Sequence, residues 1–170
     1  TWMTPAMAEV AKAEETPSAH TVRNFTAKAH SLKTGKLIYT VAYEEHWQAG
    51  RWTKRVMRAS DLEGNVFLVR TLLPDTGFRT PKLEMVNERL NFKVGAERVG
   101  KKIVARRSVD DGQPEIMEFN DDASLVIPGG LVAMIRAQWD QLMAGEKTTW
   151  RMLAPGRLDW FAVRVRSGGL

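Results

Sequence analysis

The sequence predicts a mainly β domain with a minor helical part (α+β): a curved antiparallel meander, or half-open barrel, of about nine strands packed on one amphipathic helix. Two observations support this fold class. Short segments that alternate apolar and polar residues recur at intervals of roughly 8–15 residues, with turns rich in Gly, Asp and Pro between them. By contrast, one long segment, residues 130–145, has a helical period.

The predicted helix carries one apolar stripe, formed by Leu131, Val132, Ile135, Trp139, Leu142 and Met143. Gly129 and Gly130 separate it from the preceding segment, and Gly145 stands where a helix commonly ends. A helix with one apolar side needs a surface to cover. We therefore expect it to lie against the sheet, with Trp139 buried.

The best-defined strand pair is a hairpin of residues 36–48 and 51–59, with Ala49 and Gly50 as its two central residues. A regular ladder from this turn predicts the cross-strand pairs Trp47–Trp52, Glu45–Lys54, Tyr43–Val56, Glu44–Arg55 and Ala42–Met57. This register yields one aromatic pair and two pairs of opposite charge, both of which stabilise sheets.

The other expected strands are residues 22–32, 66–73, 83–91, 99–109, 115–119, 148–153 and 158–166. Residues 83–91 fit a helix or a strand, and the hairpins around them favour a strand. Asp110, Asp111 and Gly112 indicate a tight turn, and the loop from Pro74 to Pro81 cannot occupy a central sheet position.

We expect two regions: residues 1–20 as a signal-peptide remnant and flexible lead-in, and residues 21–170 as a single β-rich domain. Ala6 and Ala8 fit the small-x-small pattern that a signal peptidase accepts, and Pro5 precedes them. This pattern favours a periplasmic or secreted protein, and without such a signal the location would be the cytoplasm. No apolar run approaches the length of a transmembrane segment.

Positive charge is concentrated in the middle of the chain, where residues 51–107 hold 14 Lys and Arg against 6 Asp and Glu. Such an excess can attract an anionic surface. The expected anionic-surface patch consists of Lys54, Arg55, Lys101, Lys102, Arg106 and Arg107. The simpler interpretation is a set of solvated charges on scattered strands.

Motifs for catalysis or cofactor binding are missing from the sequence. It has no cysteine, no Gly-x-Ser-x-Gly and no phosphate-binding loop, and we predict no catalytic residue, no metal ligand and no cofactor. Glu44 and His46 share one face of a strand, but two ligands make a weak metal site. Glu45 interrupts an apolar face and is the best catalytic candidate of a protein that we expect not to be an enzyme.

Aromatic and basic residues provide the remaining functional pattern. The candidate ligand-binding residues are Tyr39, Tyr43, Trp47, Trp52, Arg58, Trp139, Trp150 and Arg157. They can form an ordinary core between sheet and helix, or they can line an apolar pocket with a cation for an acidic group. The hairpin register above places Lys54 and Arg58 on the same face as these rings.

Two functions follow from these patterns. The first is a non-catalytic, exported binding protein whose partner is an apolar or amphipathic, lipid-like small molecule. The alternative is a structural or protein-interaction module that docks an anionic surface through residues 51–107. Export disfavours nucleic acid as a partner, although aromatic and basic residues on a sheet can also bind single strands.

Overall fold

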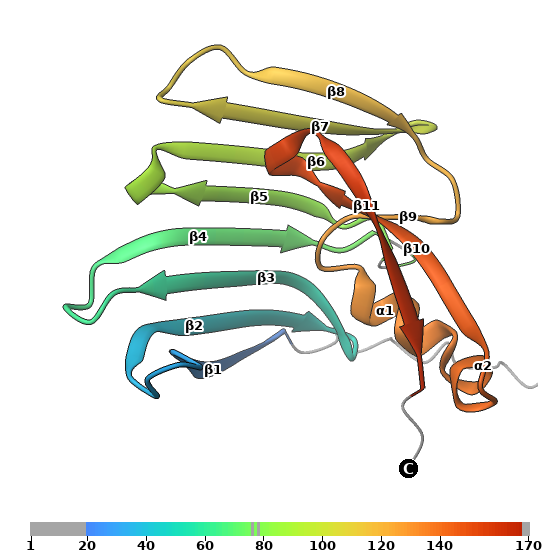
Figure 1. Cartoon of the computed structure of the whole chain (residues 1–170), viewed down its shortest axis with the longest axis horizontal. Coiled ribbons are helices and arrows are strands. Elements are labelled where there is room, and N and C mark those ends of the chain that lie inside the picture. The colour runs from blue at the N-terminus through green and yellow to red at the C-terminus, as the bar shows by residue number, and fades with distance from the viewer. Residues whose placement is uncertain (1–19, 76, 78, 168–170) are drawn as a thin grey trace, which may run out of the picture.

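The computed structural model describes residues 20–75, 77 and 79–167, and the predicted signal-peptide remnant lies outside them. An eight-stranded antiparallel meander, in the order β1 to β8, forms the main sheet (Figure 1). Its strands are β1 (Thr21–His30), β2 (Leu37–Gln48), β3 (Arg51–Ser60), β4 (Val66–Leu73), β5 (Lys82–Asn87), β6 (Phe92–Val99), β7 (Lys102–Val109) and β8 (Glu115–Asn120). The mainly β meander that the sequence predicts is therefore confirmed, and the sheet is open, with β1 and β8 as its edges.

A second, three-stranded sheet and two short helices follow the meander. The elements are β9 (Leu125–Val126), α1 (Leu131–Ala137), α2 (Trp139–Met143), β10 (Lys147–Ala154) and β11 (Asp159–Arg166), with single 3-10 turns at η1 (Glu88–Leu90) and η2 (Pro155–Arg157). β10 lies between β11 and β9 and pairs with β9 in parallel. Figure 1 shows the two helices at the end of the main sheet where β2 passes into β3.

The described residues form eleven strands rather than about nine, for two reasons. The predicted strand 99–109 is wrong at its start, because Gly100 turns the chain between β6 and β7 with a φ of 61°. β6, which precedes this turn, is therefore a separate strand that is not among those predicted. The second reason is β9, a strand of two residues. Its partner is β10, which follows it in the sequence only after both helices. Local alternation cannot reveal such a short, long-range pairing.

The β2–β3 hairpin has the predicted turn but not the predicted register. Trp47 lies opposite Trp52, as expected, and then a β-bulge shifts the ladder so that His46 lies opposite Lys54. Thr53 is the extra residue on the bulged strand. Beyond it the pairs are Glu45–Arg55, Glu44–Val56, Tyr43–Met57 and Ala42–Arg58. The predicted pairs Glu45–Lys54, Tyr43–Val56, Glu44–Arg55 and Ala42–Met57 are therefore wrong.

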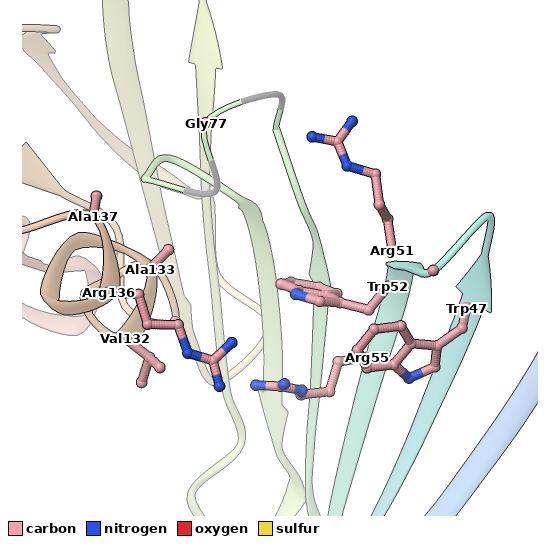
Figure 2. Close-up of a pocket in the computed structure, with 11 residues that line it drawn as sticks. Trp47, Arg51, Trp52, Arg55, Gly77, Val132, Ala133, Arg136 and Ala137 are labelled. Carbon is pink, nitrogen blue, oxygen red and sulfur yellow. The ribbon is translucent and has the colours of Figure 1, made fainter. Parts of the chain in front are cut away.

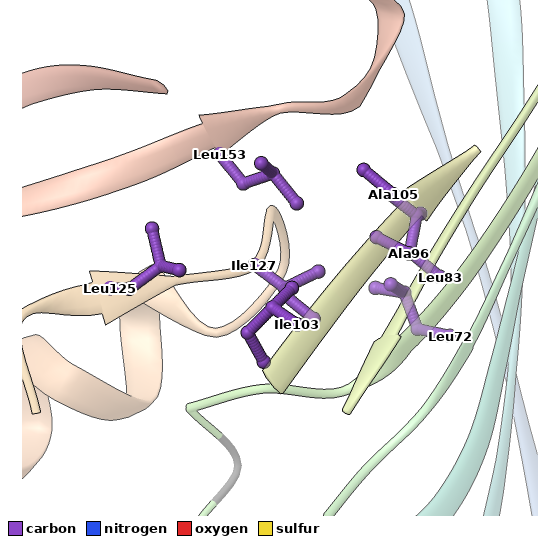
Figure 3. Packing of buried hydrophobic residues seen from close by; sticks show 8 residues of the cluster. All are labelled: Leu72, Leu83, Ala96, Ile103, Ala105, Leu125, Ile127 and Leu153. Carbon is purple, nitrogen blue, oxygen red and sulfur yellow. The ribbon is translucent and has the colours of Figure 1, made fainter. Parts of the chain in front are cut away.

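The main hydrophobic core lies between one face of the meander, here called the inner face, and the segment from β9 to β10. Figure 3 shows Leu125, Ile127 and Leu153 from that segment facing the labelled side chains of the sheet. The sheet contributes Leu72, Leu83, Ala96, Ile103 and Ala105. Since successive residues of a strand point to opposite faces, Ile103 and Ala105, two residues apart in β7, lie on the same face, as the alternation in the sequence predicts.

A second apolar cluster, formed by Val41, Met57 and Ala59, lies on the same face. Tyr39, Tyr43, Phe67 and Leu68 pack around it. These residues come from β2, β3 and β4, further along the strands from the β2–β3 turn. The inner face therefore continues as an apolar surface beyond the part that the helices approach.

The predicted helix is divided in two at Gln138, and its predicted apolar stripe is wrong for three of six residues, since Leu131 and Ile135 are half-buried and Leu142 is buried. Trp139 is 55% exposed, and Val132 and Met143 are exposed too, whereas Leu142 is buried. α1 contributes no buried side chain at all. The break changes the direction in which residues after position 138 point, so the stripe of the unbroken helix does not exist as one surface.

Candidate binding pocket

A cavity of about 470 Å³ lies between α1 and the end of the β2–β3 hairpin. This volume is within the range of pockets that bind small molecules. The hairpin contributes Trp47, Gly50, Arg51, Trp52 and Arg55, whereas Val132, Ala133, Arg136 and Ala137 come from α1. Gly77 and Gly129 complete the wall (Figure 2).

Two tryptophans form the aromatic side of the pocket. Trp47 and Trp52 are cross-strand partners, and both are partly buried. The guanidinium of Arg23 lies 4.4 Å from the ring centre of Trp47, and that of Arg55 lies 5.0 Å from the ring centre of Trp52. Such cation–π contacts orient both partners. The rings are therefore held in place by the strands and by neighbouring cations.

Glu45 anchors Arg55 from behind the pocket. Arg55 Nη2 lies 2.5 Å from Glu45 Oε1, and Trp47 Nε1 donates a hydrogen bond of 3.1 Å to Glu45 Oε2. The Glu45 side chain is only 9% exposed, so its carboxylate is well shielded from water, whereas the Arg55 side chain is 30% exposed. Both carboxylate oxygens thus have partners. Glu45 therefore positions the side chains of Arg55 and Trp47.

The opposite side of the pocket belongs to α1. The spacing of Val132 and Arg136, and of Ala133 and Ala137, places them on one side of a helix. Small and apolar side chains at three of these positions leave room between helix and hairpin, and Arg136 extends across it (Figure 2). The sequence alone could show this grouping, but not that it faces a cavity.

Only two of the predicted ligand-binding residues, Trp47 and Trp52, line this pocket. Tyr39 and Tyr43 belong to the second apolar cluster. Trp150 is buried in β10, with 2% of its surface exposed, and Trp139 is exposed on α2. Arg157 is exposed in η2.

The predicted placement of Lys54 and Arg58 on the face of the aromatic rings is wrong. The bulge at Thr53 reverses the alternation, so Arg58 lies opposite Ala42 and Lys54 opposite His46, on the outer face. For the same reason Arg55, predicted on the outer face, lies on the inner one. The pocket residues that sequence reasoning missed are Gly50, Arg51, Gly77, Gly129, Val132, Ala133, Arg136 and Ala137.

The predicted anionic-surface residues do not share one face. By the register, Arg55 and Arg107 lie on the inner face, and Lys54, Lys102 and Arg106 on the outer one. Lys101 lies in the β6–β7 turn. Four of them pair with carboxylates: Arg55 with Glu45, Lys102 with Glu118, Arg106 with Glu97 and Arg107 with Glu115.

His46 in β2 and His20, which precedes β1, lie close together. His46 Nε2 donates to Glu44 Oε1 at 2.6 Å, and this hydrogen bond holds the pKa of Glu44 below its ordinary value. His46 Nδ1 lies 3.3 Å from His20 Nε2. Within the described residues, no group of three or more acidic or histidine side chains gathers as metal ligands.

Comparisons with models of protein families, with curated proteins and with solved structures found no match. Within the described part of the chain, no helix combines the length and the apolar character that crossing a membrane requires. The candidate site therefore depends on its own geometry: a cavity with aromatic and aliphatic walls and arginines on both sides.

Proposed function

We propose that the protein is a non-catalytic binding protein for an apolar or amphipathic, lipid-like small molecule, which it holds between α1 and the β2–β3 hairpin. The observation that carries this proposal is the cavity of about 470 Å³ with Trp47, Trp52, Val132 and Ala133 in its walls. Burial of apolar ligand surface against such walls contributes about 25 cal/mol per Å².

The weak packing of α1 supports the same function. None of its residues is fully buried: Val132, Arg136 and Ala137 are exposed, and the other four are half-buried. A helix that gives little buried area to the core can move at low cost in free energy. α1 therefore serves as a cover that separates from the hairpin to admit a ligand and packs on the ligand afterwards.

Export to the periplasm or beyond remains part of the proposal. It depends on the pattern around Ala6 and Ala8, which lies outside the described residues. A binding protein for poorly soluble molecules is useful where such molecules must cross an aqueous compartment.

The test is titration with N-phenyl-1-naphthylamine, a neutral apolar dye whose fluorescence rises in apolar pockets. We expect saturable binding, and we expect Ala133→Trp, which fills the cavity from α1, to weaken it about tenfold or more. Gln141→Trp is the matched control, because Gln141 is exposed on α2 and does not line the pocket.

Absence of dye binding, together with no co-purifying small molecule in native mass spectrometry, would refute the proposal. Equal binding by the Ala133→Trp and Gln141→Trp variants would place the bound dye elsewhere on the protein.

The alternative function, docking of an anionic surface through residues 51–107, has less support. Its predicted residues are divided between two faces, and most pair with carboxylates. The opposite charges of an ion pair offset each other, so a paired residue adds little net charge to the surface. Salt also screens exposed charges at distances beyond the Debye length of about 10 Å.

A further inference from the structure

The charges that surround the pocket are all positive. Arg51 and Arg55 come from β3 and Arg136 comes from α1, and none of the described residues that line the cavity is acidic. An apolar pocket for a neutral ligand has no need of three arginines. Since a guanidinium stays charged at any pH a protein meets, these residues select for ligand charge.

Arg55 and Arg136 reach into the pocket from opposite sides. Figure 2 shows their guanidinium groups pointing toward one another across the space between hairpin and helix. Only the charge of Arg55 is offset, because Arg55 pairs with Glu45, which does not line the pocket. The guanidinium group of Arg136 has no hydrogen bond or ion pair with any described residue. Two like charges that face each other are most stable with an anion between them.

The donors of the two arginines also exceed their acceptors. Arg55 Nε is buried and finds no hydrogen-bond acceptor among the described residues. The N–H donors of the Arg136 guanidinium find no acceptor among the described residues either. A guanidinium binds a carboxylate or phosphate through two parallel hydrogen bonds, and such charge-assisted bonds are about twice as strong as neutral ones.

We propose that the ligand is an amphiphile with an anionic head group, a carboxylate or a phosphate monoester, bound between Arg55 and Arg136. Its apolar tail lies against Trp52, Val132 and Ala133. This inference rests on the proposed function and names the class of ligand. The head group would join the hairpin to α1, so binding would also hold the cover closed.

The experiment compares four ligands that share a twelve-carbon tail, by isothermal titration calorimetry below their micellar concentrations. They are dodecanoate, dodecyl phosphate, dodecanol and dodecylammonium. We expect the anions to bind about tenfold or more tighter than dodecanol, and dodecylammonium to bind most weakly. The tighter of the two anions distinguishes a fatty-acid-like source from a phospholipid-like one.

Arg136→Gln is the decisive variant, because Arg136 is exposed on a helix without buried side chains and its replacement leaves no partner unpaired. We expect it to weaken dodecanoate binding about tenfold and to leave dodecanol within about twofold. Arg157→Gln, an exposed arginine away from the pocket, is the matched control.

Loss of Arg55 needs a compensated variant, since Arg55→Gln alone would leave the buried Glu45 unpaired. The double variant Glu45→Gln with Arg55→Gln removes both charges together. We expect it to lower anion affinity while the thermal unfolding midpoint shows that the protein is still folded.

The outcomes separate the two proposals. If dodecanol and dodecanoate bind equally, the anionic class is wrong, and the pocket for apolar ligands remains. If no twelve-carbon ligand binds, both proposals fail. If Arg136→Gln and Arg157→Gln weaken anions equally, the effect is general surface charge, and the head-group site is wrong.

Discussion

Trp47 lies opposite Trp52 at the end of the β2–β3 hairpin, and directly beyond this pair a β-bulge at Thr53 shifts the register by one residue. The shift decides which side chains reach the pocket. With the bulge, Arg55 and Met57 lie on the inner face. If the same sequence formed a regular ladder through Thr53, Lys54 and Val56 would lie there. The single extra residue therefore supplies the arginine that Glu45 holds.

Deletion of Thr53 should be tolerated, because the chain would then run regularly from Trp52 to Lys54 with every later pair unchanged. Thr53 Oγ1 donates one exposed hydrogen bond to the His46 carbonyl oxygen at 3.3 Å, so we expect a loss of about 1 kcal/mol or less in the free energy of unfolding. Urea denaturation measures it.

Deletion of Arg58 is the matched control. It would move Ala59, which is 1% exposed, from the inner face to the outer one and place Ser60 in the core. We expect a loss of more than about 2 kcal/mol. Equal effects of the two deletions would contradict the bulge.

Gly129→Ala should destabilise the protein by about 2 kcal/mol or more, because two effects add. Gly129 has a φ of +103°, which is unfavourable for other residues, and a Cβ there would lie 2.6 Å from Leu72 Cδ1 in the core. Thermal and urea unfolding provide the measurement.

Gly145→Ala separates these two effects. Gly145 has a φ of +90°, but its Cβ would enter open space. We expect this variant to lose only about 1 kcal/mol, the backbone part alone. If both substitutions cost the same, the chain between β9 and α1 does not approach Leu72 as closely at Gly129 as the structure shows.

Trp139→Ala should change the free energy of unfolding by no more than about 0.5 kcal/mol, since the side chain is 55% exposed on α2. Trp150→Ala should lose about 3–5 kcal/mol, because Trp150 is 2% exposed and its removal leaves a large cavity. Urea denaturation of the two variants gives the comparison. A large loss for Trp139→Ala would show that Trp139 is buried, as the sequence predicted, and would contradict the structure.

Stability should fall in acid partly through Asp61 in the β3–β4 turn. The backbone N–H groups of Asn65 and Glu63 donate to its carboxylate at 2.9 and 3.0 Å, and with Arg89 they hold the pKa of Asp61 below its ordinary value of 3.8. A lowered folded pKa stabilises the protein above the unfolded value. This stabilisation is lost as the pH falls from about 5 through the lowered pKa.

Asp61→Asn should therefore shift the urea midpoint downward at pH 7, and the difference from the unmodified protein should shrink below about pH 4. Arg89→Gln, which removes only the charged partner, should have a smaller effect, because the Asn65 backbone hydrogen bond is the largest cause of the lowered pKa. A difference that stays constant from pH 3 to 7 would show that Asp61 does not titrate with folding.

The sequence by itself determined the meander. Turns such as Ala49-Gly50 and Asp110-Asp111-Gly112, together with apolar residues at alternate positions, specify hairpins over a few residues, and these predictions are confirmed. The strand predicted over residues 83–91 is confirmed as far as Asn87, but its end is wrong, because residues 88–90 form the turn η1. The predicted Trp47–Trp52 pair is confirmed as well, because both residues lie close to a two-residue turn that determines their register.

Only the tertiary structure decided where the pocket lies. The bulge at Thr53 serves the burial of Met57 and Ala59 against distant strands, and no pattern within the hairpin demands it. In the same way, the break at Gln138 and the cavity between Arg136 and Arg55 depend on how α1 meets the sheet. Alternation and turn chemistry act over neighbouring residues, whereas the facing of Arg55 and Arg136, which are 81 positions apart, depends on the packing of the whole chain.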